Sequence, residues 1–339
     1  YMKLAKFSVM RKGVSRLVIM SIREFSVTKS PWQKILTCID YAGKRSSVIV
    51  RAPWVYLDFM EGDVIHIIEG KNFENKRLLS DDKDLKTQKV NDNLLITNPD
   101  LLLSATTIGN SIECMRRAVL KSRFTQPGEP GILMTIGSIV HELLQEILKY
   151  KILHNTISDK FINEKLHSAV DSYTLDIIMC NETKEEVHKQ ILEEHVPHIK
   201  DFIEKYVKDG IPDAYAHISG AKQKEPISIS NVIDIEENIW SPMYGLRGFI
   251  DATVEAHVSK DKKLIVPLEI KTGKTKSIAH EAQGSIYTLL LNDRYELPVD
   301  FFLLYYTKSN DFTKHPKALE SLKHLLILRN QLSSHLKYQ

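Results

Sequence analysis

The chain has 339 residues, 43% of them hydrophobic, and its 46 Lys and Arg nearly balance its 43 Asp and Glu, for a net charge of +3. This length supports two or three domains with cores of their own. The near-neutral charge gives no whole-chain attraction to nucleic acid, so such binding must come from a local patch. No apolar run is long enough to span a membrane. Three cysteines without a CxxC pair exclude a disulfide framework and indicate a reducing compartment. Because the sequence starts at Tyr1, we expect it to be part of a longer protein.

The first 98 residues are typical of a β domain. Short β-branched runs alternate with Gly, Lys, Ser and Asp, as in strands joined by turns; the runs are "RLVIMSI", "KILTCIDY", "SSVIVRA" and "DVIHIIEG". Several short strands in about a hundred residues favour a small barrel, and an OB-like β-barrel is the natural candidate. The polar, charged stretch 70–93 is interpreted as a long loop or edge.

A helical region is predicted next. From about residue 99 apolar residues recur at helical spacing, with Ser104 or Thr107 as a cap for the first helix. The stretch 132–150 is strongly amphipathic and predicts a second helix. A third helix over 183–208 opens with a Thr-x-x-Glu capping box.

The last third of the chain mixes strands and helices. After a polar connector over 210–232, three strands, a helix, a strand and a final helix are predicted; the segments are 231–240, 246–258, 263–271, 278–293, 299–307 and 317–339. The expected fold class is therefore α/β (α+β), with an OB-like β-barrel over 1–98 and a sheet with flanking helices over 99–339.

Two carboxylates and a lysine on neighbouring predicted strands point to chemistry. Glu269 and Lys271 are two residues apart in "PLEIK", so their side chains share one face of a strand. Asp251 precedes them by about one hairpin, and antiparallel pairing would bring its carboxylate close to Glu269. Two carboxylates that close repel each other unless a cation lies between them. Oxygen ligands of this kind suit Mg²⁺ or Mn²⁺.

The pattern Asp…Glu-x-Lys then predicts phosphodiester hydrolysis. A divalent cation on Asp251 and Glu269 would acidify a water and neutralise charge on a phosphoryl oxygen. Lys271 would orient the water and stabilise charge on phosphorus. The alternative for Glu269 and Lys271 is a surface ion pair, worth about 0–1 kcal/mol.

Four motifs in order carry a resemblance to a known family. "GFIDATV", "PLEIKTGK" and Gln283-x-x-x-Tyr287 resemble the PD-(D/E)XK nuclease superfamily, RecB-type branch, and His141 in "IGSIVHELLQ" matches the upstream helix histidine of that branch. The resemblance implies a restriction-endonuclease-like nuclease core over 99–339. It also implies that His141 is a metal ligand with Asp251 and Glu269. Gln283 and Tyr287 are implied to line the site near the scissile strand; the alternative for both is a hydrogen-bonded helix edge.

A closer resemblance covers nearly the whole chain. "LLLSATTIGNSIECMRRAVL" and "DIEENIWSPMYGLRGFIDATV" are similar to the eukaryotic family of replication helicase/nucleases. This implies single-stranded or 5′-flap DNA as substrate, in Okazaki-fragment maturation and break resection. It implies a single-strand-binding protein as partner, no membrane, and a location in the nucleus, with the mitochondrion as a second site. Cys114 is implied to be the first of four [4Fe–4S] ligands in the full-length parent. The other three are not in this sequence, so no cluster is expected here.

Several features support weaker hypotheses. "TGKTK" lacks the glycine that a phosphate-binding loop needs before Gly273, so no ATP site is expected. Arg116, Arg117 and Arg247 suit phosphate contacts or plain surface charge equally. Four aromatic residues of the β domain are candidates for base stacking, although core positions are favoured for most; they are Trp32, Tyr41, Trp54 and Tyr56. The rival to a nuclease is a non-catalytic DNA-binding scaffold on a degenerate nuclease fold.

Overall fold

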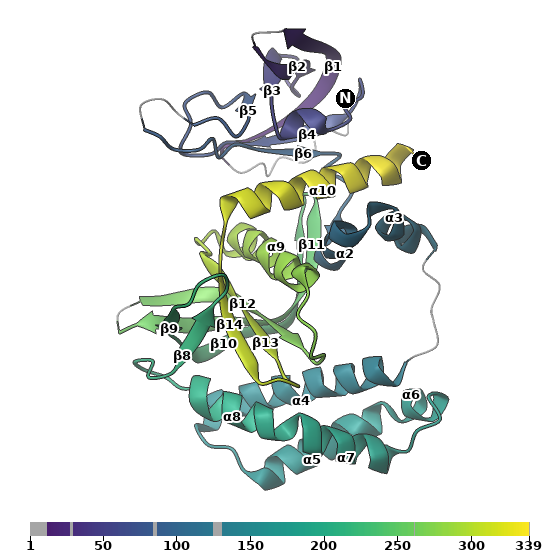
Figure 1. Cartoon of the computed structure of the whole chain (residues 1–339), viewed down its shortest axis with the longest axis vertical. Helices are drawn as coiled ribbons and strands as arrows, with labels where there is room; N and C mark the ends of the chain where they lie inside the picture. The colour runs from purple at the N-terminus through teal and green to yellow at the C-terminus, as the bar shows by residue number, and fades with distance from the viewer. Residues whose placement is uncertain (1–11, 28–29, 84–86, 125–130, 261, 339) are drawn as a thin grey trace. The chain divides into compact units, whose positions relative to one another are not determined.

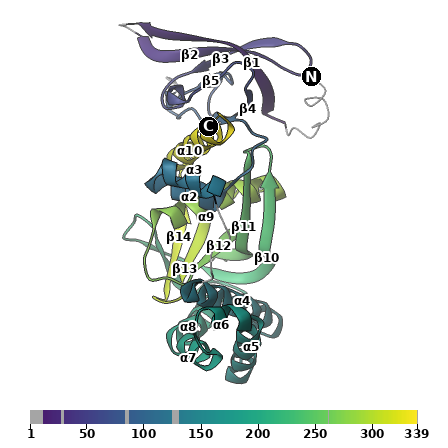
Figure 2. The same cartoon turned by 90° about the vertical axis from the view of Figure 1, so that its right-hand side faces the viewer.

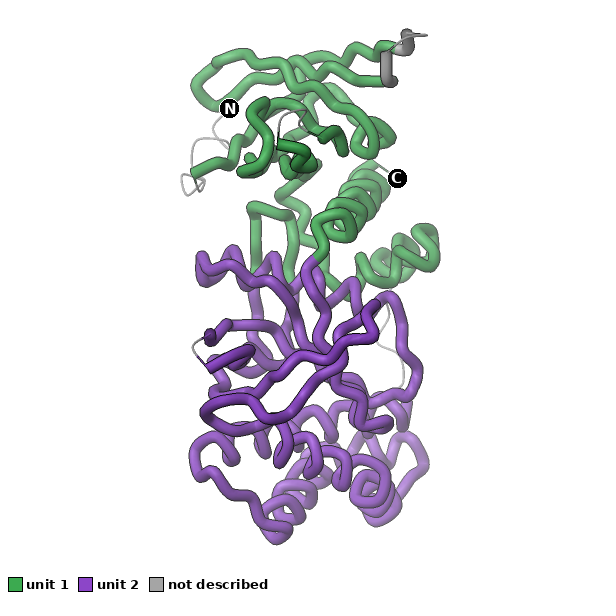
Figure 3. The backbone as a smooth tube through the Cα atoms, turned by 60° about the vertical axis from the view of Figure 1, so that its left-hand side comes forward, with its two compact units in different colours: residues 1–123, 240–247, 318–339 green, residues 124–239, 248–317 purple. Residues whose placement is uncertain are grey.

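The computed structural model describes residues 12–27, 30–83, 87–124, 131–260 and 262–338. The chain divides into two compact units, shown in Figure 3. Unit 1 comprises residues 1–123, 240–247 and 318–339, and unit 2 comprises 124–239 and 248–317. The chain therefore enters each unit more than once. The predicted boundary at residue 98 stays a prediction.

Unit 1 is built on a curled sheet with the strand order β5-β3-β2-β1-β4-β6 (Figure 1). Its strands are β1 (Val14–Val27), β2 (Ser30–Ile39), β3 (Arg45–Val50), β4 (Val64–Ile68), β5 (Leu78–Leu79) and β6 (Leu94–Thr97), with a short 3-10 helix, η1, at Trp54–Tyr56. Leu36, Val48 and Ile65 point into the core and are fully buried. The β fold expected here is confirmed, whereas its assignment as an OB barrel stays a prediction.

The rest of unit 1 is helical. It contains β7 (Leu103–Ser104), α2 (Ala105–Glu113), α3 (Met115–Phe124) and α10 (Leu319–Tyr338). Ser104 caps α2, because its Oγ accepts the Thr107 N–H at 3.1 Å. The fully buried guanidinium of Arg329 on α10 donates to four main-chain carbonyls, those of Thr97, Asn98, Leu101 and Gly245. Helix α10 is thereby fastened to the chain that leaves β6.

The second sheet carries the predicted chemistry. Its order is β10-β11-β12-β13-β14-β8-β9, with β7 paired to β11 off this path. The strands are β8 (Tyr215–Ile218), β9 (Lys224–Pro226), β10 (Ser228–Ser241), β11 (Leu246–Ser259), β12 (Lys262–Lys271), β13 (Phe301–Tyr306) and β14 (Asp311–Pro316). β11 and β12 are antiparallel, whereas β12 and β13 are parallel and joined through α9 (Ile278–Tyr295). Gly284 lets α9 approach β13, because a Cβ there would overlap the Phe302 ring.

Helices between residues 132 and 206 form a layer of their own in unit 2, seen at the lower end of Figure 2. They are α4 (Ile132–His154), α5 (Asp159–Ser172), α6 (Thr174–Met179), α7 (Lys184–Glu194) and α8 (Val196–Tyr206). Helix α4 packs against α5, α6, α7 and α8 through buried residues such as Ile139, Leu143 and Ile147. The amphipathic stretch 132–150 is therefore confirmed as the central helix of this layer.

The sequence expectations fail at three places. The single helix expected over 183–208 is broken at His195 into α7 and α8. Pro197 lies in the first turn of α8, where its missing N–H is tolerated, but it could not lie inside a continuous helix. The Thr183 capping box itself is confirmed. The expected connector 210–232 contains the strands β8 and β9, which are four and three residues long and therefore too short to show a strand pattern in the sequence. The stretch 70–93 likewise contains β5. Among the described residues, no helix is long and apolar enough to cross a membrane.

Candidate active site

Asp251 and Glu269 lie side by side in unit 2, as antiparallel pairing predicts. β11 and β12 are in register at Ala252 and Leu268, which places the two carboxylates next to that pair. The main-chain N–H of Ile270 donates to Asp251 Oδ2 at 2.7 Å. Asp251 is therefore held from β12, and its side chain faces the same region as that of Glu269.

Glu269 is buried, not at the rim of the sheet as the sequence suggested. Its exposed fraction is 1%, because α9 covers this part of β12. Lys271 Nζ donates to Glu269 Oε1 and, at 3.3 Å, to Gln283 Oε1. Glu269 Oε2 is buried and has no hydrogen-bond partner among the described residues. A buried carboxylate oxygen without a partner is costly unless a ligand satisfies it.

His141 reaches the same site from α4. Its Nδ1 lies 3.4 Å from Asp251 Oδ1. Gly137, one turn earlier, lets α4 approach β12, because a Cβ there would already lie 3.2 Å from Thr272 Oγ1. The predicted grouping of His141 with Asp251 is therefore observed.

The ionisable groups of the site are shifted by burial and by one another. Burial raises the pKa of Glu269, Asp251 raises it further, and Lys271 opposes both. Burial lowers the pKa of Lys271, but Glu269 and Asp251 outweigh this and the net shift is upward. Burial also lowers the pKa of His141, and the charge of Asp251 reverses the shift. The site thus concentrates negative charge strongly enough to retain protons or attract a cation.

Gln283 and Tyr287 extend the site along α9. Gln283 Nε2 donates to the Tyr287 hydroxyl at 2.7 Å, while its Oε1 accepts from Lys271. Tyr287 is 2% exposed, and a Cβ on Gly248 would approach its ring to 2.7 Å. Tyr287 therefore acts on the site through Gln283. The pair is hydrogen-bonded along the helix, and Gln283 also contacts Lys271, whereas its placement near a scissile strand stays a prediction.

Glu236 on β10 is a member of the site that sequence reasoning missed. Ligand atoms of His141, Glu236 and Asp251 all lie within 4.8 Å of one another. Glu236 has a φ of +53°, a left-handed conformation that is rare within a strand. Gln145 Nε2 donates to its Oε1 at 2.6 Å. The stretch "DIEENIW" carries no motif, and two consecutive glutamates do not reveal which one turns toward Asp251.

The donor set fits a divalent cation. Two carboxylates and an imidazole, those of Glu236, Asp251 and His141, have ligand atoms within 4.8 Å of one another, and on the strand beside Asp251 Glu269 Oε2 is buried without a hydrogen-bond partner among the described residues. Hard oxygen donors of this kind suit Mg²⁺ and Mn²⁺. Asp251, Glu269 and His141 would hold such an ion, which when bound acidifies water and neutralises charge on a phosphoryl oxygen.

The predicted cluster ligand Cys114 lies in unit 1, at the junction of α2 and α3. Its side chain is exposed, and its Sγ accepts the Arg117 N–H at 3.4 Å. Among the described residues, no other His, Cys, Asp or Glu joins Cys114 in a group that could hold a metal. Arg116 is exposed nearby, and Arg247 is exposed on β11. Their phosphate contacts stay predictions.

The aromatic residues of the β domain are mostly outside the core, contrary to expectation. Only Trp54 is fully buried, whereas Trp32, Tyr41 and Tyr56 are 41%, 75% and 60% exposed. Trp32 and Tyr56 pack edge to face with ring centroids 5.4 Å apart. Trp32 shares a strand face with Lys34 and buried Leu36 but lies toward the start of β2, where the core no longer covers it.

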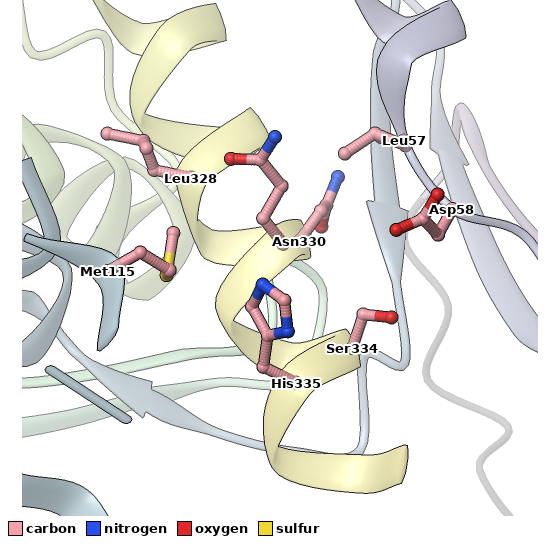
Figure 4. Close-up of a pocket in the computed structure, with 8 residues that line it drawn as sticks. Leu57, Asp58, Met115, Leu328, Asn330, Ser334 and His335 are labelled. Atoms are coloured by element: carbon pink, nitrogen blue, oxygen red, sulfur yellow. The ribbon is translucent and has the colours of Figure 1, made fainter. Parts of the chain in front are cut away.

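Two clefts lie apart from the carboxylates. One, in unit 1, has a volume of about 270 Å³ (Figure 4), with Asn330, Ser334 and His335 of α10 facing Leu57, Asp58 and Met115. It contains none of the predicted catalytic residues. The other, in unit 2, has a volume of about 300 Å³ and begins one residue after Lys271; among the residues that line it are Ile136, Gln190, His195, Thr272, Lys274 and Lys308.

The fold and the site together define a class: an α/β protein whose sheet presents a carboxylate cluster suited to a divalent cation. Residues 39–256 match the family model of DNA replication factor Dna2, and the chain belongs to this family. It is 57% identical over 336 residues to the DNA replication ATP-dependent helicase/nuclease DNA2 of Saccharomyces cerevisiae, and 31% identical to the proteins of that name from Schizosaccharomyces pombe and Homo sapiens. These matches cover 99%, 85% and 88% of the chain, but only 22%, 19% and 28% of the relatives.

Proposed function

We propose that this chain hydrolyses phosphodiester bonds in single-stranded DNA with Mg²⁺ or Mn²⁺, cutting flaps or free ends. The observation that carries the proposal is the arrangement of Asp251, Glu269 and Lys271 on paired strands, with Glu269 Oε2 buried and without a hydrogen-bond partner among the residues that the structure describes. A structural ion pair alone does not account for that oxygen, because a purely structural site would satisfy it.

Each residue has a role in this proposal. Asp251, Glu269 and His141 bind the cation, and the Ile270 N–H fixes the orientation of Asp251. The Lys271 ammonium orients the attacking water and stabilises charge that develops on phosphorus. Gln283 holds Lys271 by accepting a hydrogen bond from its Nζ.

The cleft beside Lys271 supports a path for the DNA strand. Its Lys274 supplies positive charge, Lys308 lies in an ion pair with Glu194, and Ile136 supplies an apolar wall. Phosphates and bases need these two kinds of surface respectively. A strand lying there would bring a phosphate to the carboxylates.

The biological setting follows from the relatives, which are named DNA replication helicase/nucleases. We infer a role in Okazaki-fragment maturation and end resection, a nuclear and additionally mitochondrial location, and a replication single-strand-binding protein as partner. Two further inferences rest on the same resemblance. Cys114 is a [4Fe–4S] ligand in the longer parent, and helicase activity is not expected of the residues in this chain.

The test is cleavage of a labelled 5′-flap DNA by the pure protein, with Mg²⁺ or with EDTA. We expect cleavage only with Mg²⁺, and its loss in Glu269→Gln with DNA binding retained. Glu255→Gln is the matched control, because Glu255 lies on β11 but bonds only Ser230 and Lys263 outside the site. Cleavage that survives in Glu269→Gln would refute the assignment. A wild type that binds DNA without cutting it would favour the scaffold.

A further inference from the structure

We propose that Thr307, held in place by His195 and His198, positions Lys271 by fixing the end of strand β12. These three residues, Thr307, His195 and His198, are called the Thr307 clamp below. The inference rests on the proposed function, because it adds positioning residues to the same site. Thr307 is fully buried, so it acts on the site through Lys271 and not by contact with DNA.

The clamp begins at the break between α7 and α8. His195 lies between the two helices, and Pro197 in the first turn of α8 keeps them separate. His195 Nδ1 lies 2.8 Å from Thr307 Oγ1, and His198 Nδ1 lies 3.0 Å from the Thr307 carbonyl oxygen. The two histidines therefore hold Thr307 by its side chain and by its main chain.

Neighbours of Thr307 also fasten the end of β13 to this helix break. The Tyr305 hydroxyl donates to the His198 carbonyl at 2.9 Å. Lys308 Nζ forms an ion pair with Glu194, the last residue of α7, at 2.5 Å. The segment from Tyr305 to Lys308 is thus attached to α7 and α8 by side chains on both sides of Thr307.

Thr307 transmits this attachment to Lys271. Strands β12 and β13 are in register at Lys271 and Tyr306, and the Thr307 N–H donates to the Lys271 carbonyl at 2.8 Å. β12 ends at Lys271, so this hydrogen bond lies at the end of the ladder, where strands open most readily. A displacement of the Lys271 main chain would move its ammonium, which contacts Glu269 and Gln283.

The burial of His195 favours a specific hydrogen bond over simple packing. Its side chain is 2% exposed, and burial lowers the pKa of His195 from 6.5 to about 4. The charges of Lys308 and His198 also lower this pKa, whereas Glu194 opposes them, so the ring is neutral at pH 7. A buried imidazole is costly unless its nitrogens are hydrogen-bonded, and Thr307 Oγ1 supplies a partner.

The first measurement is single-turnover cleavage of labelled 5′-flap DNA with Mg²⁺. Thr307→Val removes Oγ1 with little change of shape, and we expect about 10–100-fold slower cleavage with unchanged DNA affinity, because small displacements of a catalytic group have effects of this size. Thr307→Ser retains the hydroxyl and should cleave nearly as fast as the wild type. Ile162→Val, at a buried position of α5, is the control for general destabilisation.

A double variant tests whether the clamp acts through Lys271. In Lys271→Met, adding Thr307→Val should slow cleavage no further, because residues that act as one unit are not additive. Equal slowing by Thr307→Val in the wild type and in Lys271→Met would overturn the proposal.

Two substitutions of His195 test its Nδ1 contact. In His195→Asn the amide lies where Nδ1 lies in histidine, whereas in His195→Gln it lies near the position of Nε2. We expect cleavage close to that of the wild type in His195→Asn and slower cleavage in His195→Gln. Equal rates in the two variants would overturn the role of the Nδ1 contact.

Hydrogen exchange of the Thr307 amide, followed by NMR, tests the clamp without DNA. We expect about 10-fold faster exchange in His195→Gln than in the wild type, the order expected for the loss of one hydrogen bond, and little change in His195→Asn. Wild-type exchange in His195→Gln overturns the clamp. A wild type that does not cut DNA refutes the proposed function, and the exchange result then decides by itself whether the clamp holds the Lys271 carbonyl.

Discussion

Lys271 contacts one carboxylate oxygen of Glu269, and the other oxygen is buried with no hydrogen-bond partner in the described parts of the chain. The two residues are neighbours on one face of β12, so the contact needs no change of the strand backbone. One oxygen of Glu269 is therefore satisfied by the protein and the other is open to a ligand. The consequences of this arrangement are measurable in stability as well as in catalysis.

Replacement of Lys271 by Met should lower the cleavage rate about 10²–10³-fold, as expected when one charge-stabilising donor is lost. It should also lower the free energy of unfolding by about 3 kcal/mol, because Glu269 becomes a buried, unpaired carboxylate. The double variant Lys271→Met, Glu269→Gln should regain most of that stability but no activity. Urea denaturation and flap cleavage measure the two effects; a double variant as unstable as the single one contradicts the explanation.

Arg329→Met should destabilise unit 1 strongly. The guanidinium is fully buried and donates to four main-chain carbonyls. We expect a loss of about 3 kcal/mol or more. Arg329→Lys should recover little of it, because an ammonium lacks the planar fork. Thermal unfolding gives the result, with the exposed Arg116→Met as control; equal effects for the two would count against this role.

Gly248→Ala should impair catalysis without touching a ligand. A Cβ at this position would lie 2.7 Å from atoms of Tyr287 and Leu290, so α9 must shift. The shift displaces Tyr287, and with it Gln283 and Lys271, because hydrogen bonds join the three side chains. We expect a loss of about 1–3 kcal/mol in stability and slower cleavage, with Mn²⁺ binding unchanged. Gly131→Ala, where a Cβ meets nothing within 4 Å and φ is −90°, is the control.

His66 should make unit 1 less stable in mild acid. Its Nδ1 and Nε2 lie 3.0 Å from the Met243 carbonyl and Arg16 Nη1, so the neutral ring fits and a second proton would face Arg16. Burial lowers the pKa of His66 from 6.5 to about 4. Between those values the unfolded chain binds the proton and the folded chain does not, so stability falls as pH falls from 6.5 to 4, by at most about 3 kcal/mol.

The measurement is urea denaturation of the metal-free protein at pH 7 and at pH 5. His66→Gln should flatten the pH dependence while lowering stability at pH 7. If the wild type and His66→Gln lose stability in parallel on acidification, another group is responsible.

The sequence was sufficient for the carboxylate pair but not for the whole site. Asp251 lies on a strand with alternating apolar residues and Glu269 at the end of a continuous apolar run, so both strands could be predicted, and antiparallel pairing brings the two carboxylates together. Glu236 required information that local pattern does not contain: a positive φ and a hydrogen bond from Gln145, a residue 91 positions earlier. The burial of Tyr287 depends in the same way on Gly248, a contact set by tertiary packing.

Elements were missed for a related reason. β8 and β9 are only four and three residues long, and they are strands because β14 pairs with β8 and β8 pairs with β9. The helix break at His195 could be predicted from Pro197, which lies two residues later in the sequence. The local sequence therefore predicts where most helices and strands end, whereas β8 and β9 depend on pairing with other strands.

The hydrogen bonds of α10 have a consequence for how this chain can be shortened. Asn330 donates to the Leu95 carbonyl and accepts the Thr97 N–H, so the last helix and strand β6 complete each other's hydrogen bonding. A protein trimmed to begin at residue 99 would retain every candidate catalytic side chain yet leave buried polar groups on Arg329 and Asn330 without partners. The N-terminal sheet is therefore not a separable domain, because helix α10 at the far end of the chain depends on strand β6 for its hydrogen bonds.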